Sequence, residues 1–207
     1  IKQLKEDMDR IRQLYRTKGF YLAEVAHEVK VEEATNKAWV YLRITEGAKI
    51  RVRRIDFVGN KTLSARRLRK AMATKKGWLF LAGYYRPEVL EEDVERIRRL
   101  YQADGFSDVQ VKSQTLFDER KRRLTVTMTI EEGPRYLVGE IGLKGVRQLD
   151  PEELKGTLKL TPAKPFSQEK LSQDVAALQS AYFAKGYMAA AVEPATVLNP
   201  ATGRVDL

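Results

Sequence analysis

The side chains that most often carry out chemistry are scarce in this sequence. It contains no cysteine and a single histidine, His27, so a thiolate site or a cluster of imidazole ligands is excluded. No serine or carboxylate stands at the spacing of a catalytic triad or a phosphate-binding loop. We therefore expect no enzyme, no catalytic residue, no metal, no cofactor and no small-molecule substrate, and a structural role for His27 on the apolar face of a strand.

The charged residues suggest a different kind of chemistry, the binding of an anionic partner. The formal net charge is +10 at pH 7, and most of the surplus lies between residues 50 and 133. One short predicted helix carries a possible basic patch made of Arg66, Arg67, Arg69 and Lys70. Such a patch could meet anionic lipid, nucleic acid or an acidic protein, or it could be an ordinary solvated face.

Large apolar side chains gather in the loop that follows this helix. The possible partner-binding residues of the loop are Trp78, Leu79, Phe80, Tyr84 and Tyr85. An apolar patch at the surface marks an interaction site, whereas the same residues could fold back over the neighbouring helices. We expect the loop to fold back.

An internal repeat explains how these residues are positioned. Residues 90–106 have copies at 4–20 and 171–187, with Leu, Asp, Tyr, Gly and an aromatic residue at matching positions. The offset is 86 residues from Leu4 to Leu90 and 81 residues from Leu90 to Leu171. A repeat of this length is a small domain rather than a solenoid unit.

Each complete repeat is predicted to contain three strands and two helices in the order β-α-α-β-β. The fold class is then α+β, with three-stranded mixed sheets that are each covered on one face by two helices. The predicted domains are a partial unit of helix, strand and strand at 1–49, a complete unit at 50–133, and a unit truncated in its last strand at 134–207. We expect the sequence to be a piece of a longer chain. No run approaches the roughly 18 apolar residues that a membrane-spanning helix needs.

A proline indicates the strand order. Pro194 falls in the predicted strand that follows the long helix of the third unit. Proline cannot donate to a ladder, so this strand is expected at an edge and the last strand at the centre, which gives the order first, third, second. In the middle unit the edge strand is expected at Asp108, Val109, Gln110, Val111, Lys112, Ser113, Gln114 and Thr115, and a second edge at residues 24–31.

An exposed edge is a binding surface in its own right. Its unpaired N–H and C=O groups can accept an extended chain through main-chain hydrogen bonds, almost regardless of the side chains of that chain. An edge that is simply solvated is the alternative for either strand.

The motifs at the ends of these elements resemble those of the POTRA domain. They are Val58-Gly59-Asn60 after a first strand, the run from Tyr101 to Phe106 at the end of a long helix, and Glu-Gly after a last strand at Glu46-Gly47 and Glu132-Gly133. The resemblance covers the whole chain. The chain is most similar to the tandem POTRA arrays of the BamA-type outer-membrane β-barrel assembly factor family. The aromatic loop suggests the end of the second, all of the third and most of the fourth domain of such an array.

The resemblance implies a non-enzymatic binding scaffold. It implies a periplasmic location, attachment to the bacterial outer membrane through a covalently linked C-terminal β-barrel, capture of unfolded outer-membrane proteins, and docking of accessory lipoproteins. The third unit has Gly145-Val146 where Gly-Asn is expected, and Pro194 in its edge strand, so strand addition is not expected there.

Two other functions stay open at this point. The chain could be the POTRA region of a two-partner secretion or related translocation transporter. It could also be a basic nucleic-acid-binding module, but Thr125, Thr127 and Thr129 stand on the sheet face where stacking aromatics would be needed. We therefore expect no nucleic-acid partner.

Overall fold

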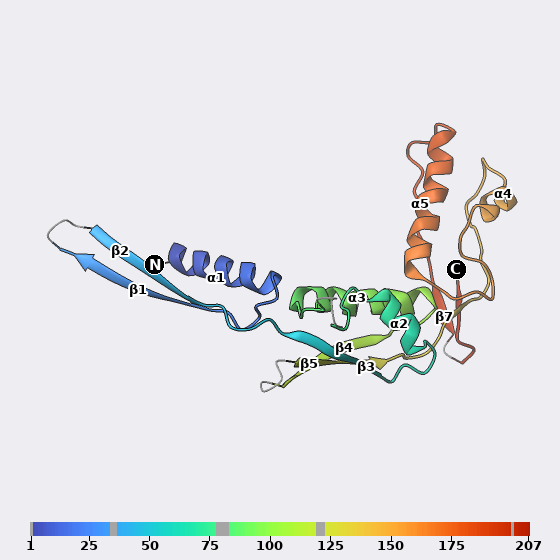
Figure 1. Cartoon of the computed structure of the whole chain (residues 1–207). Coiled ribbons are helices and arrows are strands. Elements are labelled where there is room, and N and C mark those ends of the chain that lie inside the picture. The colour runs from blue at the N-terminus through green and yellow to red at the C-terminus, as the bar shows by residue number, and fades with distance from the viewer. Residues whose placement is uncertain (1, 34–36, 78–82, 119–122, 200) are drawn as a thin grey trace. The chain divides into compact units, whose positions relative to one another are not determined.

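The computed structural model describes residues 2–33, 37–77, 83–118, 123–199 and 201–207. Its elements, drawn in Figure 1, are α1 (Lys2–Thr17), β1 (Glu24–Glu32), β2 (Lys37–Thr45), β3 (Arg51–Val58), α2 (Ala65–Ala71), α3 (Pro87–Ala103), β4 (Gln110–Asp118), β5 (Arg123–Glu131), β6 (Leu137–Val138), α4 (Pro151–Gly156), α5 (Gln168–Ala184), β7 (Val197–Asn199) and β8 (Arg204–Asp206). The predicted order of elements is therefore observed.

The chain divides into two compact units, and the middle repeat contributes to both. The first unit comprises residues 1–58, 65–94 and 112–129, and the second comprises residues 59–64, 95–111 and 130–207. None of the helices in the described part of the chain is both long and apolar enough to cross a membrane.

In the first unit, β1 and β2 form an antiparallel hairpin whose register runs without a break from Glu24 opposite Thr45 to Glu32 opposite Lys37. Helix α1 anchors one end of it, where Arg12 donates a hydrogen bond to the carbonyl of Val25. Val25 is buried, but among the described residues the rest of both strands is exposed. His27 itself is exposed, because no described layer covers that stretch of the hairpin.

The middle and third repeats have the strand order predicted from the sequence. The two three-stranded sheets run β3-β5-β4 and β6-β8-β7. The first strand of each is parallel to the central one, and β7 is antiparallel to β8. In Figure 1, α2 and α3 lie on the same side of the middle sheet. These three-stranded mixed sheets with their helices confirm the α+β fold class.

The expected strand around Pro194 is shorter than predicted. Strand β7 contains only Val197–Asn199, and Pro194 lies before it. The neighbouring central strand, β8, ends at Asp206, so the segment that carries Pro194 has no described ladder partner. The order inferred from this proline is correct, although the proline itself is not in the strand.

A buried carboxylate ties the two helices of a repeat together. Asp93 of α3 is fully buried and accepts hydrogen bonds from the backbone N–H groups of Ala73 and Thr74, at 2.6 and 2.8 Å, just after α2. Two charge-assisted bonds to backbone donors satisfy the carboxylate and end the short helix. Because the acceptor sits on the long helix, it also fixes the distance between the helices.

The third repeat contains the same arrangement. Asp174 of α5 accepts from the N–H groups of Lys159 and Leu160 at 2.8 and 2.9 Å. Both aspartates occupy the repeated Asp position noted in the sequence. In the first repeat that position is Asp7, which is exposed and pairs with Arg10 at 3.5 Å. The repeat therefore preserves a connection between helices, and not only a packing face.

Candidate functional site

Strand β4 is the candidate binding edge, because it stands at the end of the sheet order and among the described strands neighbours only β5. Val111 is buried, while Gln110, Lys112, Gln114 and Thr115 are exposed. Leu116, further along, is 76% exposed. The strand thus combines one apolar anchor in the core with a solvated outer part, the surface that strand addition requires.

The observed strand is shifted relative to the predicted one. It begins at Gln110 and continues to Asp118, so the expected edge residues Asp108 and Val109 lie before it. Asp108 follows the helix-ending turn, and its carboxylate accepts a hydrogen bond from the Tyr136 hydroxyl at 3.2 Å. Val109 is buried beside that turn. These two positions are structural and are removed from the candidate edge.

The opposite edge of the middle sheet is partly covered by the chain itself. The N–H of Val52 in β3 donates to the carbonyl of Gly83, and the carbonyl of Val52 accepts from Gly77, both at 2.9 Å. The N–H of Tyr85 donates to the carbonyl of Ile50 at 2.9 Å. The start of β3 therefore has its outer hydrogen-bonding groups occupied.

The third repeat covers its first strand in the same way. Val138 donates to Lys164 and accepts from Ala163, each at 2.8 Å, and Phe166 donates to Tyr136 at 3.0 Å. In both repeats the described part of the segment between the two helices lies along the outer side of the first strand. This repeated cover makes the edge on the other side of the middle sheet, β4, the better candidate for a partner strand.

The aromatic loop is described only at its ends. Trp78, Leu79 and Phe80 lie outside the described residues. Tyr85 is buried and packs edge-on against Tyr21, with ring centroids 5.1 Å apart. Burial raises the pKa of the Tyr85 hydroxyl above its ordinary value of 10.0. Tyr85 therefore belongs to the interior and is not available to a partner.

Tyr84 is half-buried between two cations. Lys49 Nζ lies 4.8 Å and Arg51 Cζ lies 5.8 Å from the centre of its ring. A Cβ atom on Gly19 would come within 3.0 Å of the Tyr84 Cβ. The described end of the loop thus packs against Gly19, Lys49 and Arg51, and the expectation that the whole loop folds back over the two helices stays a prediction.

The four residues of the basic patch are all exposed on α2. The guanidinium of Arg69 lies 5.5 Å from the centre of the Phe57 ring. Arg69 therefore makes a cation–π contact with a residue of β3. Within the described residues no group of three or more metal-binding side chains is arranged to hold an ion. Helix α2 therefore presents positive charge without a metal site next to it.

The second predicted edge, at residues 24–31, corresponds to β1. In the hairpin each strand has a single neighbour, so both β1 and β2 have an outer side without a described strand. The exposed apolar residues of the hairpin are Val29, Val31, Trp39, Val40, Tyr41, Leu42 and Ile44.

The repeat motifs converge at one point of the middle repeat. Glu132 accepts hydrogen bonds from the N–H and hydroxyl of Thr62, both at 2.8 Å, and from the Tyr101 hydroxyl at 2.9 Å. Burial alone would raise the pKa of the Glu132 carboxyl, but the bonds from Thr62 and Tyr101 outweigh it and lower the pKa below 4.5. Burial and the bond to Glu132 raise the pKa of Tyr101.

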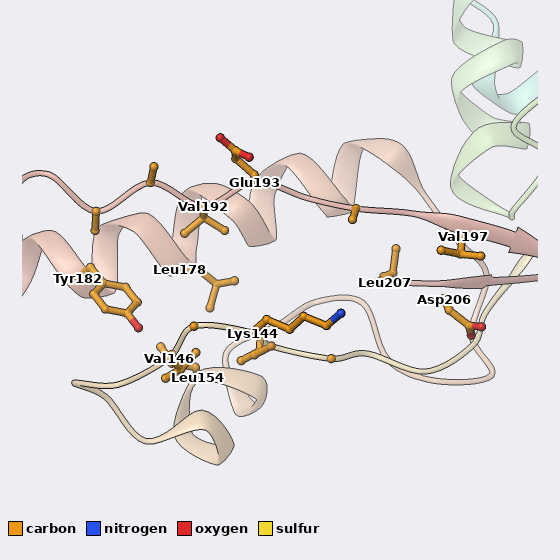
Figure 2. Close-up of a pocket in the computed structure, with 16 residues that line it drawn as sticks. Lys144, Val146, Leu154, Leu178, Tyr182, Val192, Glu193, Val197, Asp206 and Leu207 are labelled. Carbon is orange, nitrogen blue, oxygen red and sulfur yellow. The ribbon is translucent and has the colours of Figure 1, made fainter.

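The third repeat has an open groove of about 560 Å³ at the corresponding place. Figure 2 shows Leu178 and Tyr182 pointing from α5 toward the segment with Lys144 and Val146, and Leu207 lies just after β8. In the middle repeat the end of β5 lies in this region, at positions whose counterparts by the repeat offset would come after Leu207. A Cβ on Gly59 would meet the Ile130 carbonyl oxygen at 2.0 Å, whereas a Cβ on Gly145 would meet nothing within 4 Å.

Comparison with known proteins agrees with this architecture. The family model POTRA, described as "Surface antigen variable number repeat", matches residues 50–133 and 136–207. The chain is 29% identical over 203 residues to the outer membrane protein assembly factor BamA of Nitratidesulfovibrio vulgaris, covering 94% of this chain and 26% of that protein. It is 24% identical over 179 residues to BamA of Neisseria meningitidis serogroup B, covering 84% of this chain and 22% of that protein.

Solved structures show the same fold. The crystal structure of Haemophilus influenzae BamA POTRA domains 3–5 matches with a TM-score of 0.53 at 19% identity, over 99% of this chain and 78% of that one. The BamA structure from Haemophilus ducreyi that lacks POTRA domains 1–3 matches with a TM-score of 0.50 at 19% identity, over 65% of this chain and 24% of that one. The chain spans about a quarter of the length of the curated relatives it matches. It belongs to the POTRA family and resembles the POTRA region of BamA-type assembly factors.

Proposed function

We propose that this chain is a periplasmic binding scaffold of an outer-membrane protein assembly factor, and that it receives unfolded β-barrel precursors along the outer edge of β4. One observation carries the proposal: the start of β3 has its outer side occupied by the chain itself, while β4 ends the sheet. An extended client added beside β4 would make main-chain hydrogen bonds and would extend the sheet.

This mechanism suits clients of many sequences. Backbone groups are the same in every residue, so an edge that recognises them tolerates almost any side chain. Most exposed residues of β4 are polar, which disfavours association between edges of two chains when no client is bound. Accessory subunits would dock elsewhere, and the exposed cations of α2 fit an acidic partner.

The experiment is a titration with a peptide taken from a barrel strand, followed by NMR of the labelled chain. We expect shifts that follow residues 110–118, with smaller shifts in β5. Shifts that leave β4 unchanged would contradict the proposal.

A proline scan supplies the matched controls. Proline is placed singly at Lys112, Ser113, Gln114 and Thr115 of β4. N–H groups along a strand alternate in direction, so proline at every other position removes a bond to β5 and lowers stability, whereas the remaining prolines remove an outward donor. The variants that keep full stability should weaken peptide binding about tenfold. Alanine at Lys112 or Gln114 should leave binding nearly unchanged, because only the side chain is lost.

A further inference from the structure

A pocket of about 420 Å³ lies in the first compact unit, where the end of α1 meets the segments around α2 and α3. Its described lining includes four cationic residues, Lys18, Lys75, Lys76 and Arg86, and no acidic residue. All four are exposed. A concave site lined by charges of one sign concentrates counter-ions of the other sign, so the pocket is suited to an anion.

Most of these cations are not neutralised by the protein. Within the described residues Lys18, Lys76 and Arg86 form no salt bridge. Lys75 donates to the carbonyls of Arg69 and Met72 at the end of α2, which leaves its positive charge beside the pocket. The nearby carboxylate of Asp93 is already engaged by the backbone of Ala73 and Thr74.

A buried hydroxyl also lines the pocket. Thr74 is 7% exposed, and its Oγ1 atom has no hydrogen-bond partner in the described chain. A buried hydroxyl without a partner destabilises a protein, so it is normally retained only where something satisfies it. An anion in the pocket would accept this hydrogen bond.

The third repeat provides an internal control. Asp174 accepts hydrogen bonds from the backbone N–H groups of Lys159 and Leu160, as Asp93 does from those of Ala73 and Thr74. The residue that matches Thr74 is therefore Leu160, which is buried in an apolar core cluster. The fold accepts an aliphatic side chain at this position, so the hydroxyl is not needed for the repeat to form.

The cations are likewise absent from the matching positions. By the repeat offsets, the counterparts of Lys18, Lys75, Lys76 and Arg86 are Asp104, Thr161, Pro162 and Ser167. A POTRA repeat can therefore be built without this charge. The pocket of the first compact unit thus combines four cations with an unpartnered hydroxyl, and the matching positions have neither.

We propose that this pocket, defined by Lys18, Thr74, Lys75, Lys76 and Arg86, binds a phosphate group. Phosphate oxygens accept several hydrogen bonds at once, from ammonium and guanidinium groups and from a hydroxyl. The group could be carried by a phospholipid headgroup or be a free phosphate ion, and the chemistry of recognition is the same. The site is independent of the β4 edge.

The first experiment is an NMR titration of the chain with inorganic phosphate. We expect shifts at residues 73–76, 18 and 86, and a dissociation constant that rises with salt. Lys76→Ala should weaken binding about tenfold, as the loss of a charge-assisted hydrogen bond does. The control variant Lys70→Ala, on α2 outside the pocket, should not. Equal responses of both variants, or shifts spread evenly over all basic residues, would overturn the proposal.

Thr74→Val separates binding from folding. Valine has the shape of threonine without the hydroxyl, so the variant should be at least as stable as the original protein while its affinity for phosphate falls about tenfold. Unchanged affinity in a folded Thr74→Val protein would overturn the role of the hydroxyl.

Vesicles distinguish the two sources of phosphate. Sedimentation of the chain with phosphatidylglycerol vesicles that is lost in both Thr74→Val and Lys76→Ala would assign a lipid headgroup. Binding of inorganic phosphate without sedimentation would assign a free phosphate. Sedimentation that both variants retain would show that vesicles bind elsewhere and would contradict the lipid assignment.

Discussion

The middle and third repeats have the same helical layer but differ in a residue that follows the short helix. Each has a buried aspartate that accepts two backbone N–H groups after its short helix. The parallel register also starts identically, with Val52 opposite Leu124 and Val138 opposite Val205. After the short helix, however, the middle repeat has Thr74, whose buried hydroxyl has no partner in the described chain, and the third repeat has Leu160, which packs into an apolar cluster.

The aspartate connection therefore forms with either a hydroxyl or an aliphatic side chain beside it. The two repeats differ in the surroundings of this connection and not in the connection itself.

The largest expected effect comes from breaking the helical connection. Asp93→Ala leaves two backbone N–H groups without their acceptor in a buried place, which should lower the free energy of unfolding by about 4 kcal/mol. Asp174→Ala should have a similar effect in the third repeat. Asp7→Ala, at the exposed copy, should change stability by no more than about 0.5 kcal/mol. Urea unfolding followed by circular dichroism measures all three, and equal effects at Asp7 and Asp93 would contradict the comparison.

A glycine pair tests the contact between the turn after β3 and the end of β5. Gly59 and Gly145 both have positive φ angles, 85° and 76°, so alanine is strained at either site by about 1 kcal/mol. At Gly59 the new Cβ also collides with the Ile130 carbonyl, which should raise the cost to about 3 kcal/mol. Thermal unfolding of Gly59→Ala and Gly145→Ala should show this difference. Equal losses would mean that the end of β5 does not press on Gly59.

The smallest effect is a pH dependence confined to the middle repeat. Because hydrogen bonds lower the pKa of Glu132 below 4.5, the ionised carboxylate stabilises the folded state above pH 4.5, and this contribution is lost as the pH falls through the folded-state pKa. Glu132→Gln should therefore be less stable than the original protein at pH 7, and the difference should shrink at lower pH. Unfolding midpoints between pH 3 and pH 7 measure it. Glu131→Gln, at the exposed neighbouring position, is the control. A difference in unfolding midpoint between Glu132→Gln and the original protein that stays constant over this pH range would contradict the assignment.

Much of the fold could be predicted from local patterns. Each of the three long helices is followed by a glycine with a positive φ angle, at Gly19, Gly105 and Gly186. Glycine commonly ends helices in this left-handed conformation. The β-α-α-β-β order and the strand order were also predictable, because periodicity and the position of Pro194 are visible in the chain. Strand limits were less accurate: β4 begins two residues later than Asp108, since the turn after α3 extends to Val109.

The candidate sites were only partly predictable. The exposed cations of α2 and the edge position of β4 follow from local sequence and strand order. The pocket around Thr74 was missed, because its residues come from the ends of α1, α2 and the loop before α3. A comparison between copies of the repeat could have found it. Thr74 stands where the third repeat has Leu160, and the four cations have no cationic residue at their matching positions.

The sequence by itself determined the repeat, the type and order of its elements, and the ends of its helices, since each depends on residues close together in the chain. Only the tertiary structure decided what the repeated residues do. It placed Asp93 against the backbone after α2, turned Tyr85 inward, and gave β3 a cover that β4 lacks among the described residues. These outcomes depend on contacts between distant segments, and a buried polar group or an unpaired edge is recognisable only when its neighbours in space are known.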